Sequence, residues 1–282
     1  MMTIGVVGAG VMGADIALLC AAHGMRVVLK DVDQAVLDKF AVELPQKLRG
    51  YKMMGCTFTR TAAQMLELVQ ATLDYAPLAD VDWIIESAPE NVELKQQVYA
   101  ELARVCRADT YYAVNTSCIP ITKLAAQMPD PSRVLGAHFM NPVPLKKAVE
   151  VVRGFHTSDA SIEAAKGLLK QLGKNAIVVK DFPGFVANRL SHLFMNEAAF
   201  LVQDGVAKPA EIDAIFREGY GHKMGPLETA DLIGLDTVLH SLDVLYQHYQ
   251  DPKFRCCPLL RQMVDAGLHG KKSGRGFYDY NS

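Results

Sequence analysis

One stretch of the chain, AHFMNPVPLKKAVEVV, holds a histidine and a carboxylate that could act together. His138 ends the strand-like run RVLGA, and the prolines after it turn the chain away. Glu150 alternates with valines, where a carboxylate is costly unless it has a partner. A carboxylate beside an imidazole fixes its tautomer and stabilises the imidazolium, as a general base requires. We therefore expect His138 and Glu150 to pair; the alternative is a histidine with a structural role only.

A glycine pattern near the N-terminus could hold a dinucleotide. Gly8, Gly10 and Gly13 form G-x-G-x-x-G, with Val11 and Met12 between the last two, directly after an apolar run and directly before a helical pattern. In that context the glycines allow a tight turn, close backbone approach to a pyrophosphate, and packing of helix on strand. The pattern therefore predicts a dinucleotide site at the start of the helix.

An acidic residue follows at the distance expected for ribose recognition. Asp31 ends the run RVVLKD, 18 residues beyond Gly13. Its carboxylate would accept hydrogen bonds from ribose hydroxyls and repel a 2'-phosphate, which favours NAD over NADP. Two readings stay open: Asp31 could be a simple turn residue, and the neighbouring Lys30 could tolerate a phosphate.

The elements that must position these residues follow from the apolar pattern. Short β-branched runs alternate with helix-period stretches as far as Lys180, which predicts a Rossmann-type, doubly wound, mostly parallel α/β sheet. Helical patterns at 35–49 and 61–69 predict a helical arm near residues 35–70. After Asp181 the strand signals stop and prolines mark helix starts. We expect a dinucleotide-binding domain at 1–182 and a smaller all-helical domain at 183–282.

Composition narrows the class of protein. The chain has 282 residues, 50% of them hydrophobic, and a net charge of -2, which gives no general field for nucleic acid or a membrane surface. Its six cysteines show no C-x-x-C spacing, and its N-terminus shows no signal segment. We therefore expect a cytoplasmic protein with reduced thiols and neither a metal site nor a membrane span.

Six ordered blocks resemble the 3-hydroxyacyl-CoA dehydrogenase family, and its bacterial 3-hydroxybutyryl-CoA members in particular. The resemblance runs essentially end to end. The blocks are GAGVMGADIA, NTSCIPIT, HFMNPVPLKKAVEVVRG, DFPGFVANRL, MGPLETADLIGLD and GKKSGRGFYDY.

The resemblance implies an NAD-dependent dehydrogenase of short 3-hydroxyacyl thioesters that forms a homodimer through its helical domain. It implies that His138 is the base, Glu150 its partner, and that Ser117 and Asn188 hold the substrate oxygens. It also implies a lining for the nicotinamide half of the cofactor: Glu90, Lys95, Asn141 and Lys272. Taken from the residues alone, Ser117 could instead cap the helix predicted near 121–127, Asn188 could be a solvated surface residue, and Glu90 and Lys95 could be helix surface.

Two departures from the family pattern leave the substrate open. Lys146 stands where the family usually has an apolar residue, and it is either a surface lysine without a role or an indication of a polar or acidic acyl group. The basic cluster of the arm is sparse, which leaves the acyl carrier open. Relatives in polyketide extender-unit biosynthesis act on hydroxyacyl groups tethered to an acyl carrier protein, so the substrate is expected to be either an acyl-CoA or an acyl carrier protein thioester. A third alternative is a non-catalytic, structural NAD-binding protein.

Overall fold

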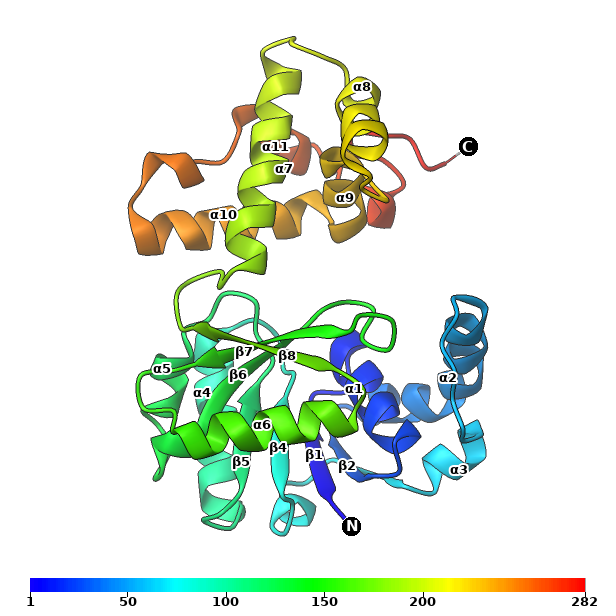
Figure 1. The fold of residues 1–282 in the computed structure, drawn as a ribbon, viewed down its shortest axis with the longest axis vertical. Coiled ribbons are helices and arrows are strands. Elements are labelled where there is room, and N and C mark those ends of the chain that lie inside the picture. The colour runs from blue at the N-terminus through cyan, green and yellow to red at the C-terminus, as the bar shows by residue number, and fades with distance from the viewer. Residues whose placement is uncertain (282) are drawn as a thin grey trace. The chain divides into compact units, whose positions relative to one another are not determined.

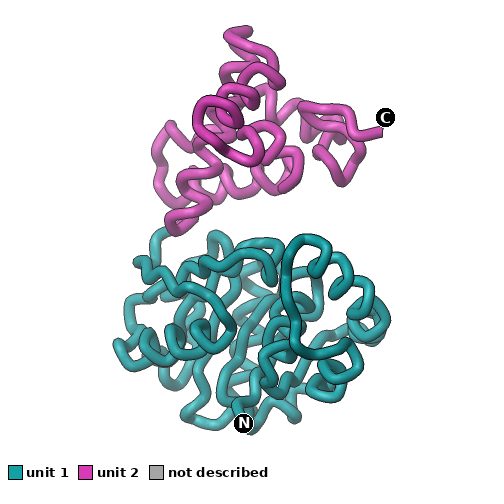
Figure 2. The backbone as a smooth tube through the Cα atoms, turned by 45° about the vertical axis from the view of Figure 1, so that its right-hand side comes forward, with its two compact units in different colours: residues 1–182 teal, residues 183–282 magenta. Residues whose placement is uncertain are grey.

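The computed structural model of the chain describes residues 1–281. It divides the chain into two compact units, Met1–Phe182 and Pro183–Ser282 (Figures 1 and 2). Each unit has its own apolar core and is described by itself below.

Unit 1 is built on one eight-stranded sheet in the order β3-β2-β1-β4-β5-β6-β7-β8 (Figure 1). All neighbouring strands are parallel except β6 and β7. The strands are β1 (Thr3–Val7), β2 (Arg26–Lys30), β3 (Val69–Thr72), β4 (Trp83–Glu86), β5 (Tyr111–Val114), β6 (Val134–Phe139), β7 (Ala148–Arg153) and β8 (Asn175–Lys180). The predicted Rossmann-type, mostly parallel sheet is therefore confirmed.

The strand order reverses between β1 and β4. From β1 the chain winds outward through β2 and β3 on one side, and through β4, β5 and β6 on the other. In such sheets ligands lie at this reversal, beyond the carboxyl ends of the strands. We call the rim where β1, β4, β5 and β6 end the carboxyl edge.

Helices pack on the sheet as the apolar pattern requires. Residues of α1 (Val11–Ala22), α2 (Gln34–Met53) and α6 (Asp159–Gln171) join one buried apolar cluster with strand residues. The helices α4 (Val92–Val105) and α5 (Ile121–Ala125) also belong to this unit, and α5 packs against β6.

The helical arm forms with different boundaries from those expected. Its first helix, α2, continues through Gly50 to Met53, because a single glycine is tolerated within a helix. Its second helix, α3 (Ala62–Leu66), is shorter than the predicted 61–69, because Val69 already pairs with Val27 in the sheet.

Unit 2 is helical, and prolines begin three of its helices as expected. Its described residues contain only isolated β-bridges besides helices and loops. The α-helices are α7 (Ala187–Gln203), α8 (Pro209–Ala214), α9 (Pro226–Ile233), α10 (Leu235–Tyr249) and α11 (Pro258–Asp265). No helix among residues 1–281 is both long enough and apolar enough to cross a bilayer.

Two buried carboxylates hold unit 2 together. Asp213 accepts hydrogen bonds from the backbone N–H groups of Leu227 and Glu228 at the start of α9, at 2.9 and 2.8 Å. Asp231 accepts from the N–H groups of Phe277 and Tyr278, both at 3.0 Å. The closing GRGFYDY segment is therefore fastened to α9.

Candidate active site

The three glycines of the loop after β1 differ in the space that a Cβ atom would have at each position. Gly8 has φ +94°, and a Cβ there would lie 2.6 Å from the carbonyl oxygen of Ser87. A Cβ on Gly13 would lie 1.7 Å from the carbonyl oxygen of Gly8. A Cβ on Gly10, in contrast, would meet no described atom within 4 Å. The packing of the chain therefore requires the first and third glycines, while the second leaves open space of the kind a pyrophosphate needs.

The start of α1 is suited to a negatively charged ligand. Gly10 is its N-cap, so no side chain caps the helix, and its first turn holds no acidic residue. Val11, in that turn, is 67% exposed. Uncapped N–H groups and the helix dipole favour an anion at this position.

Asp31 joins the end of β2 to this loop. Its carboxylate accepts hydrogen bonds from the backbone N–H groups of Ala9 at 2.6 Å and Val32 at 2.7 Å. The neighbouring Lys30 is buried, and its ammonium lies 4.1 Å from the centre of the Tyr75 ring. Burial lowers the pKa of Lys30. This cation is therefore engaged with an aromatic ring, which weakens the case for a 2'-phosphate.

His138 and Glu150 lie directly opposite each other on the antiparallel strands β6 and β7. Opposed residues of such a pair project from the same face of the sheet. Their side chains are buried, and Nδ1 of His138 lies 2.8 Å from a carboxylate oxygen of Glu150. Since a carboxylate only accepts, Nδ1 donates, and Nε2 of the neutral ring is left as an acceptor. The structure thus brings together the two groups that the sequence analysis paired.

Ser117 lies on the other side of the imidazole. Its hydroxyl is 3.3 Å from Nε2 of His138 and follows β5 at the carboxyl edge. The alternative that Ser117 caps α5 is wrong, because the N-cap of this helix is Pro120. The backbone N–H groups at the start of α5, those of Ile121 and Thr122, donate to the Asp181 carboxylate at 3.0 and 2.8 Å.

Glu90 fixes the backbone that carries Ser117. One of its carboxylate oxygens accepts from Oγ1 of Thr116 at 2.6 Å and from the N–H groups of Ser117 and Cys118, both at 3.0 Å. Reading Glu90 as plain helix surface is therefore wrong. Any contact with the nicotinamide stays a prediction.

Lys95 is fully buried, so its helix-surface alternative is also wrong. Its ammonium donates to both carboxylate oxygens of Glu86, at 2.7 and 2.9 Å, and to the carbonyl oxygen of Ala88 at 3.1 Å. Burial raises the pKa of Glu86, and the positive charge of Lys95 opposes that rise. This buried ion pair lies at the carboxyl end of β4, and sequence reasoning missed Glu86.

Asn115 is a second residue that the sequence analysis did not single out. Its side chain donates to Oγ of Ser87 at 3.4 Å and accepts from the N–H of Phe139 at 3.3 Å. It therefore links the ends of β4, β5 and β6 beside His138. Its place directly after a strand, two residues before Ser117, was a signal that could have found it.

Of the three remaining predicted residues, one lies in a loop of unit 1 and two lie in unit 2. Asn141 is exposed in the loop between β6 and β7. Asn188 lies in the first turn of α7 in unit 2, where its carbonyl oxygen lies 2.9 Å from Nδ1 of His192. Lys272, also in unit 2, forms an ion pair of 2.6 Å with Asp236. Their roles stay predictions.

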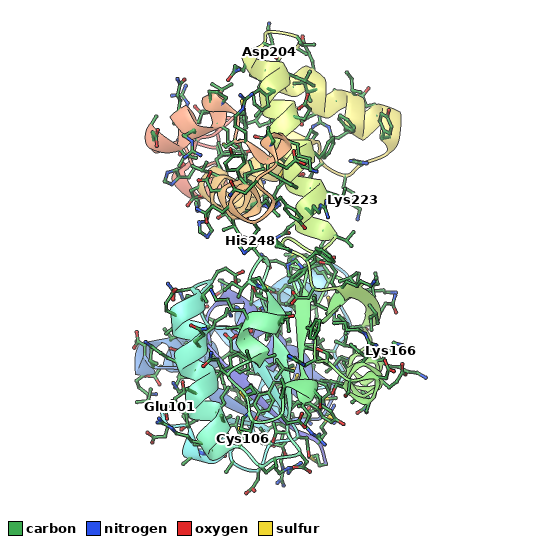
Figure 3. The ribbon with its side chains drawn as sticks, turned by 90° about the vertical axis from the view of Figure 1, so that its left-hand side faces the viewer. Glu101, Cys106, Lys166, Asp204, Lys223 and His248 are labelled. Atoms are coloured by element: carbon green, nitrogen blue, oxygen red, sulfur yellow. The ribbon has the colours of Figure 1, made fainter. Side chains whose placement is uncertain are left out.

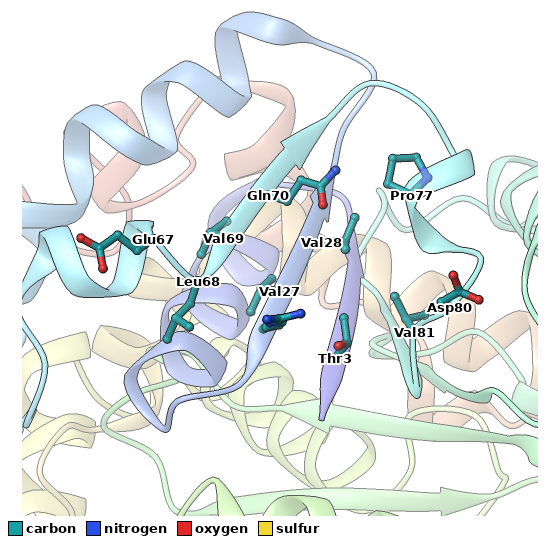
Figure 4. Close-up of a pocket in the computed structure, with 11 residues that line it drawn as sticks. Thr3, Val27, Val28, Glu67, Leu68, Val69, Gln70, Pro77, Asp80 and Val81 are labelled. Carbon is teal, nitrogen blue, oxygen red and sulfur yellow. The ribbon is translucent and has the colours of Figure 1, made fainter. Parts of the chain in front are cut away.

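An open hollow of about 420 Å³ lies elsewhere in unit 1 (Figure 4). It is lined by Thr3 of β1, by residues 26–28 of β2, by residues 67–70, and by Pro77, Asp80 and Val81. None of the predicted site residues lines it. Among residues 1–281, no group of histidine, cysteine and acidic side chains is arranged to hold a metal ion.

Comparison with known proteins identifies the family. The family model described as the NAD-binding domain of 3-hydroxyacyl-CoA dehydrogenase matches residues 3–182, and the model of the C-terminal domain matches residues 184–280. The chain belongs to the 3-hydroxyacyl-CoA dehydrogenase family. The resemblance stated from the six sequence blocks is confirmed, and the chain is an NAD-dependent dehydrogenase.

Individual relatives match over nearly their whole length. The chain is 43% identical over 279 residues to a probable 3-hydroxybutyryl-CoA dehydrogenase of Deinococcus radiodurans, covering 99% of this chain and 100% of the relative. It is 44% identical over 280 residues to a protein of the same description in Bacillus subtilis, covering 98% and 96%. The crystal structure of (S)-3-hydroxybutyryl-CoA dehydrogenase from Ralstonia eutropha matches with a TM-score of 0.94 and 41% identity, covering 100% of both chains.

Replacing Gly10 with alanine should weaken NADH binding without disturbing the fold. The added methyl meets no described atom within 4 Å, and φ at Gly10 is -63°, which alanine adopts readily. The methyl would instead occupy space needed by the cofactor, at a cost of about 1–3 kcal/mol in binding. Fluorescence titration with NADH measures the loss. Gly50→Ala is the matched control, since a Cβ there also meets no described atom within 4 Å. Equal NADH affinity in both variants would refute the assignment.

Proposed function

We propose that the chain oxidises a short 3-hydroxyacyl thioester to the 3-oxoacyl thioester, with His138 as the general base supported by Glu150. The observation that carries this proposal is the line of contacts from the Ser117 hydroxyl through the imidazole to the Glu150 carboxylate. It lies at the carboxyl edge, on the same sheet as the glycine loop. The relatives from Deinococcus and Bacillus, described as probable 3-hydroxybutyryl-CoA dehydrogenases, point to 3-hydroxybutyryl-CoA as the substrate.

Each residue has a definite task in this reaction. When bound, NAD accepts a hydride from the carbon that bears the 3-hydroxyl. Nε2 of His138 takes the hydroxyl proton, and Glu150 stabilises the imidazolium that results. Ser117 and Asn188 orient the substrate oxygens, so that the reacting groups meet in one geometry. In the reverse direction the imidazolium returns its proton to the carbonyl oxygen.

Cofactor binding in this proposal depends on the glycine pattern, on Asp31 and on the residues that the family resemblance names. The glycine loop and the start of α1 take the pyrophosphate, and Asp31 accepts from the adenosine ribose. The nicotinamide half is lined by Glu90, Asn141 and Lys272, while the fully buried Lys95 acts on this region only through Glu86 and the Ala88 carbonyl. Unit 2 also supplies the homodimer interface, and the six free cysteines suit a reducing cytoplasm.

A second candidate is the same chemistry on a hydroxyacyl group tethered to an acyl carrier protein, as in polyketide extender-unit biosynthesis. The arm favours it, because two of its cations are engaged within the chain: Lys47 pairs with the buried Asp15 at 3.2 Å, and Arg60 donates to the carbonyl oxygen of Ala22 at 3.0 Å. Fewer cations are then available for the phosphates of coenzyme A. The exposed Lys146 adds a positive charge near the site, where it could meet an acidic carrier.

The carrier is tested by measuring NADH formation with two substrates, 3-hydroxybutyryl-CoA and the same acyl group on an acyl carrier protein. Efficient turnover of the coenzyme A thioester supports the first candidate. Turnover of the carrier-protein thioester alone would replace it with the second. Tight NADH binding without turnover of either would favour a non-catalytic, structural NAD-binding protein.

A further inference from the structure

A buried ammonium group holds the loop between the strands of His138 and Glu150. Lys174 is 7% exposed, and its Nζ donates to three backbone carbonyl oxygens of that loop. The distances are 2.5 Å to Val143, 3.3 Å to Pro144 and 2.7 Å to Lys146.

The match between donors and acceptors is complete. An ammonium carries three N–H donors and no acceptor, and here three carbonyls converge on it. Pro142 and Pro144 have no N–H of their own, so this loop has fewer internal donors with which to satisfy its carbonyls. No carboxylate among residues 1–281 lies within ion-pair distance of Nζ. The carbonyl dipoles are therefore the groups that solvate this charge.

The backbone around Lys174 is itself fixed. Its N–H donates to the carbonyl oxygen of Leu169 near the end of α6, at 2.8 Å. The next residue, Asn175, begins β8 and donates to the carbonyl oxygen of Lys147 at 2.7 Å. Two consecutive residues thus bind the loop, one through its side chain and one through its backbone.

From these contacts we infer that Lys174 is a positioning residue for the reaction. The register of an antiparallel pair depends on the conformation of the loop that joins its strands, and a slip of one residue turns each side chain to the other face. Residues 140–147 have little regular structure of their own, and they form a loop longer than that of most β-hairpins. By fixing this loop, Lys174 keeps His138 opposite Glu150 and sets the position of Asn141, without touching substrate. The inference rests on the proposed function.

The test compares Lys174→Met with Lys166→Met. Lys166 projects from the outer side of α6 (Figure 3), where it forms a surface ion pair with Glu163 at 2.7 Å. Both variants are assayed below the onset of thermal unfolding, with substrate carrying either hydrogen or deuterium on the carbon that loses the hydride.

We expect Lys174→Met to lower kcat by about tenfold to a hundredfold, since small misplacements of reacting groups have effects of this size. Its isotope effect on kcat should rise above that of the wild type, because the hydride step becomes slower than product release. Lys166→Met should match the wild type.

Several outcomes would overturn the inference. The first is a Lys174→Met variant with the kcat and the isotope effect of the wild type. The second is a variant whose activity falls only in proportion to its folded fraction, with an unchanged isotope effect. A purely structural residue would give this second result. If the methionine variant does not fold, Lys174→Arg is measured instead. Arginine keeps the positive charge but spreads its N–H donors over a plane, so the isotope effect on kcat should again rise. A wild-type isotope effect in Lys174→Arg would refute the positioning role. A wild type without turnover would instead refute the proposed function.

Discussion

Replacing His138 with glutamine should leave NADH binding intact and lower kcat by roughly a hundredfold or more, the usual contribution of a general base. Glutamine fills a similar volume and can still hydrogen bond to Glu150, but its amide cannot take a proton from the substrate hydroxyl. His138 lies on β6, which β4 and β5 separate from β1 and its glycine loop, so the dinucleotide site should be unaffected. Steady-state turnover and NADH titration on the same preparation separate the two effects.

The matched control for this variant is His156→Gln, which changes an exposed histidine in the turn after β7. It should retain wild-type turnover. If His138→Gln keeps the turnover of this control, the assignment of the base is wrong. If it loses NADH binding together with turnover, His138 has a structural role instead.

Replacing Lys95 with methionine should destabilise unit 1 by about 3–5 kcal/mol, because it leaves the Glu86 carboxylate buried without its counter-charge. Urea unfolding followed by fluorescence measures this, since Trp83 is the single tryptophan and begins the strand that ends in Glu86. Lys39→Met is the control, because it removes a surface pair with Glu43 at 3.7 Å that is worth less than about 1 kcal/mol. A loss for Lys95→Met no larger than that of the control would contradict the importance of the buried pair.

The destabilisation of Lys95→Met should depend on pH with a definite sign. Burial raises the pKa of Glu86, and the opposing charge is gone in the variant. A carboxyl whose pKa is higher in the folded than in the unfolded state favours folding at low pH, and this contribution is lost as the pH rises through the folded-state pKa. The variant should therefore be closest to the wild type in mildly acidic solution. A double variant, Glu86→Gln with Lys95→Met, removes both charges and should recover part of the loss at neutral pH.

The sequence predicted those features that depend on neighbouring residues or on a regular period. The glycine loop is a local pattern, and the structure places Gly8 and Gly13 against backbone carbonyls as that pattern requires. The alternation around Glu150 marked a carboxylate in need of a partner, and the structure pairs it with His138, twelve residues earlier, rather than with the exposed His156, which is nearer in sequence.

The features that were not predicted depend on interaction partners that are distant in sequence and come together only in the folded chain. Lys95 lies in a helix with an unremarkable charge pattern, and only the packing of α4 shows that its ammonium is buried against the end of β4. Lys174 stands in a polar turn that reads as surface, yet its partners are carbonyls about thirty residues earlier, which leave no trace in residue type. The end of α3 was misplaced for a similar reason, since pairing of Val69 with β2 outweighs the helical period.

The reversal of direction between β6 and β7 also affects how the chain folds. A parallel partner for β6 would have required a crossover of a dozen or more residues, usually with a helix. The antiparallel arrangement needs only residues 140–147, the shortest connection between consecutive strands of unit 1. Contacts between residues close in sequence lose little loop-closure entropy and form early. Pairing of β1 with β4 joins residues nearly eighty positions apart and therefore loses more loop-closure entropy. The imidazole and its carboxylate can thus meet as a local hairpin before the dinucleotide crevice has been assembled.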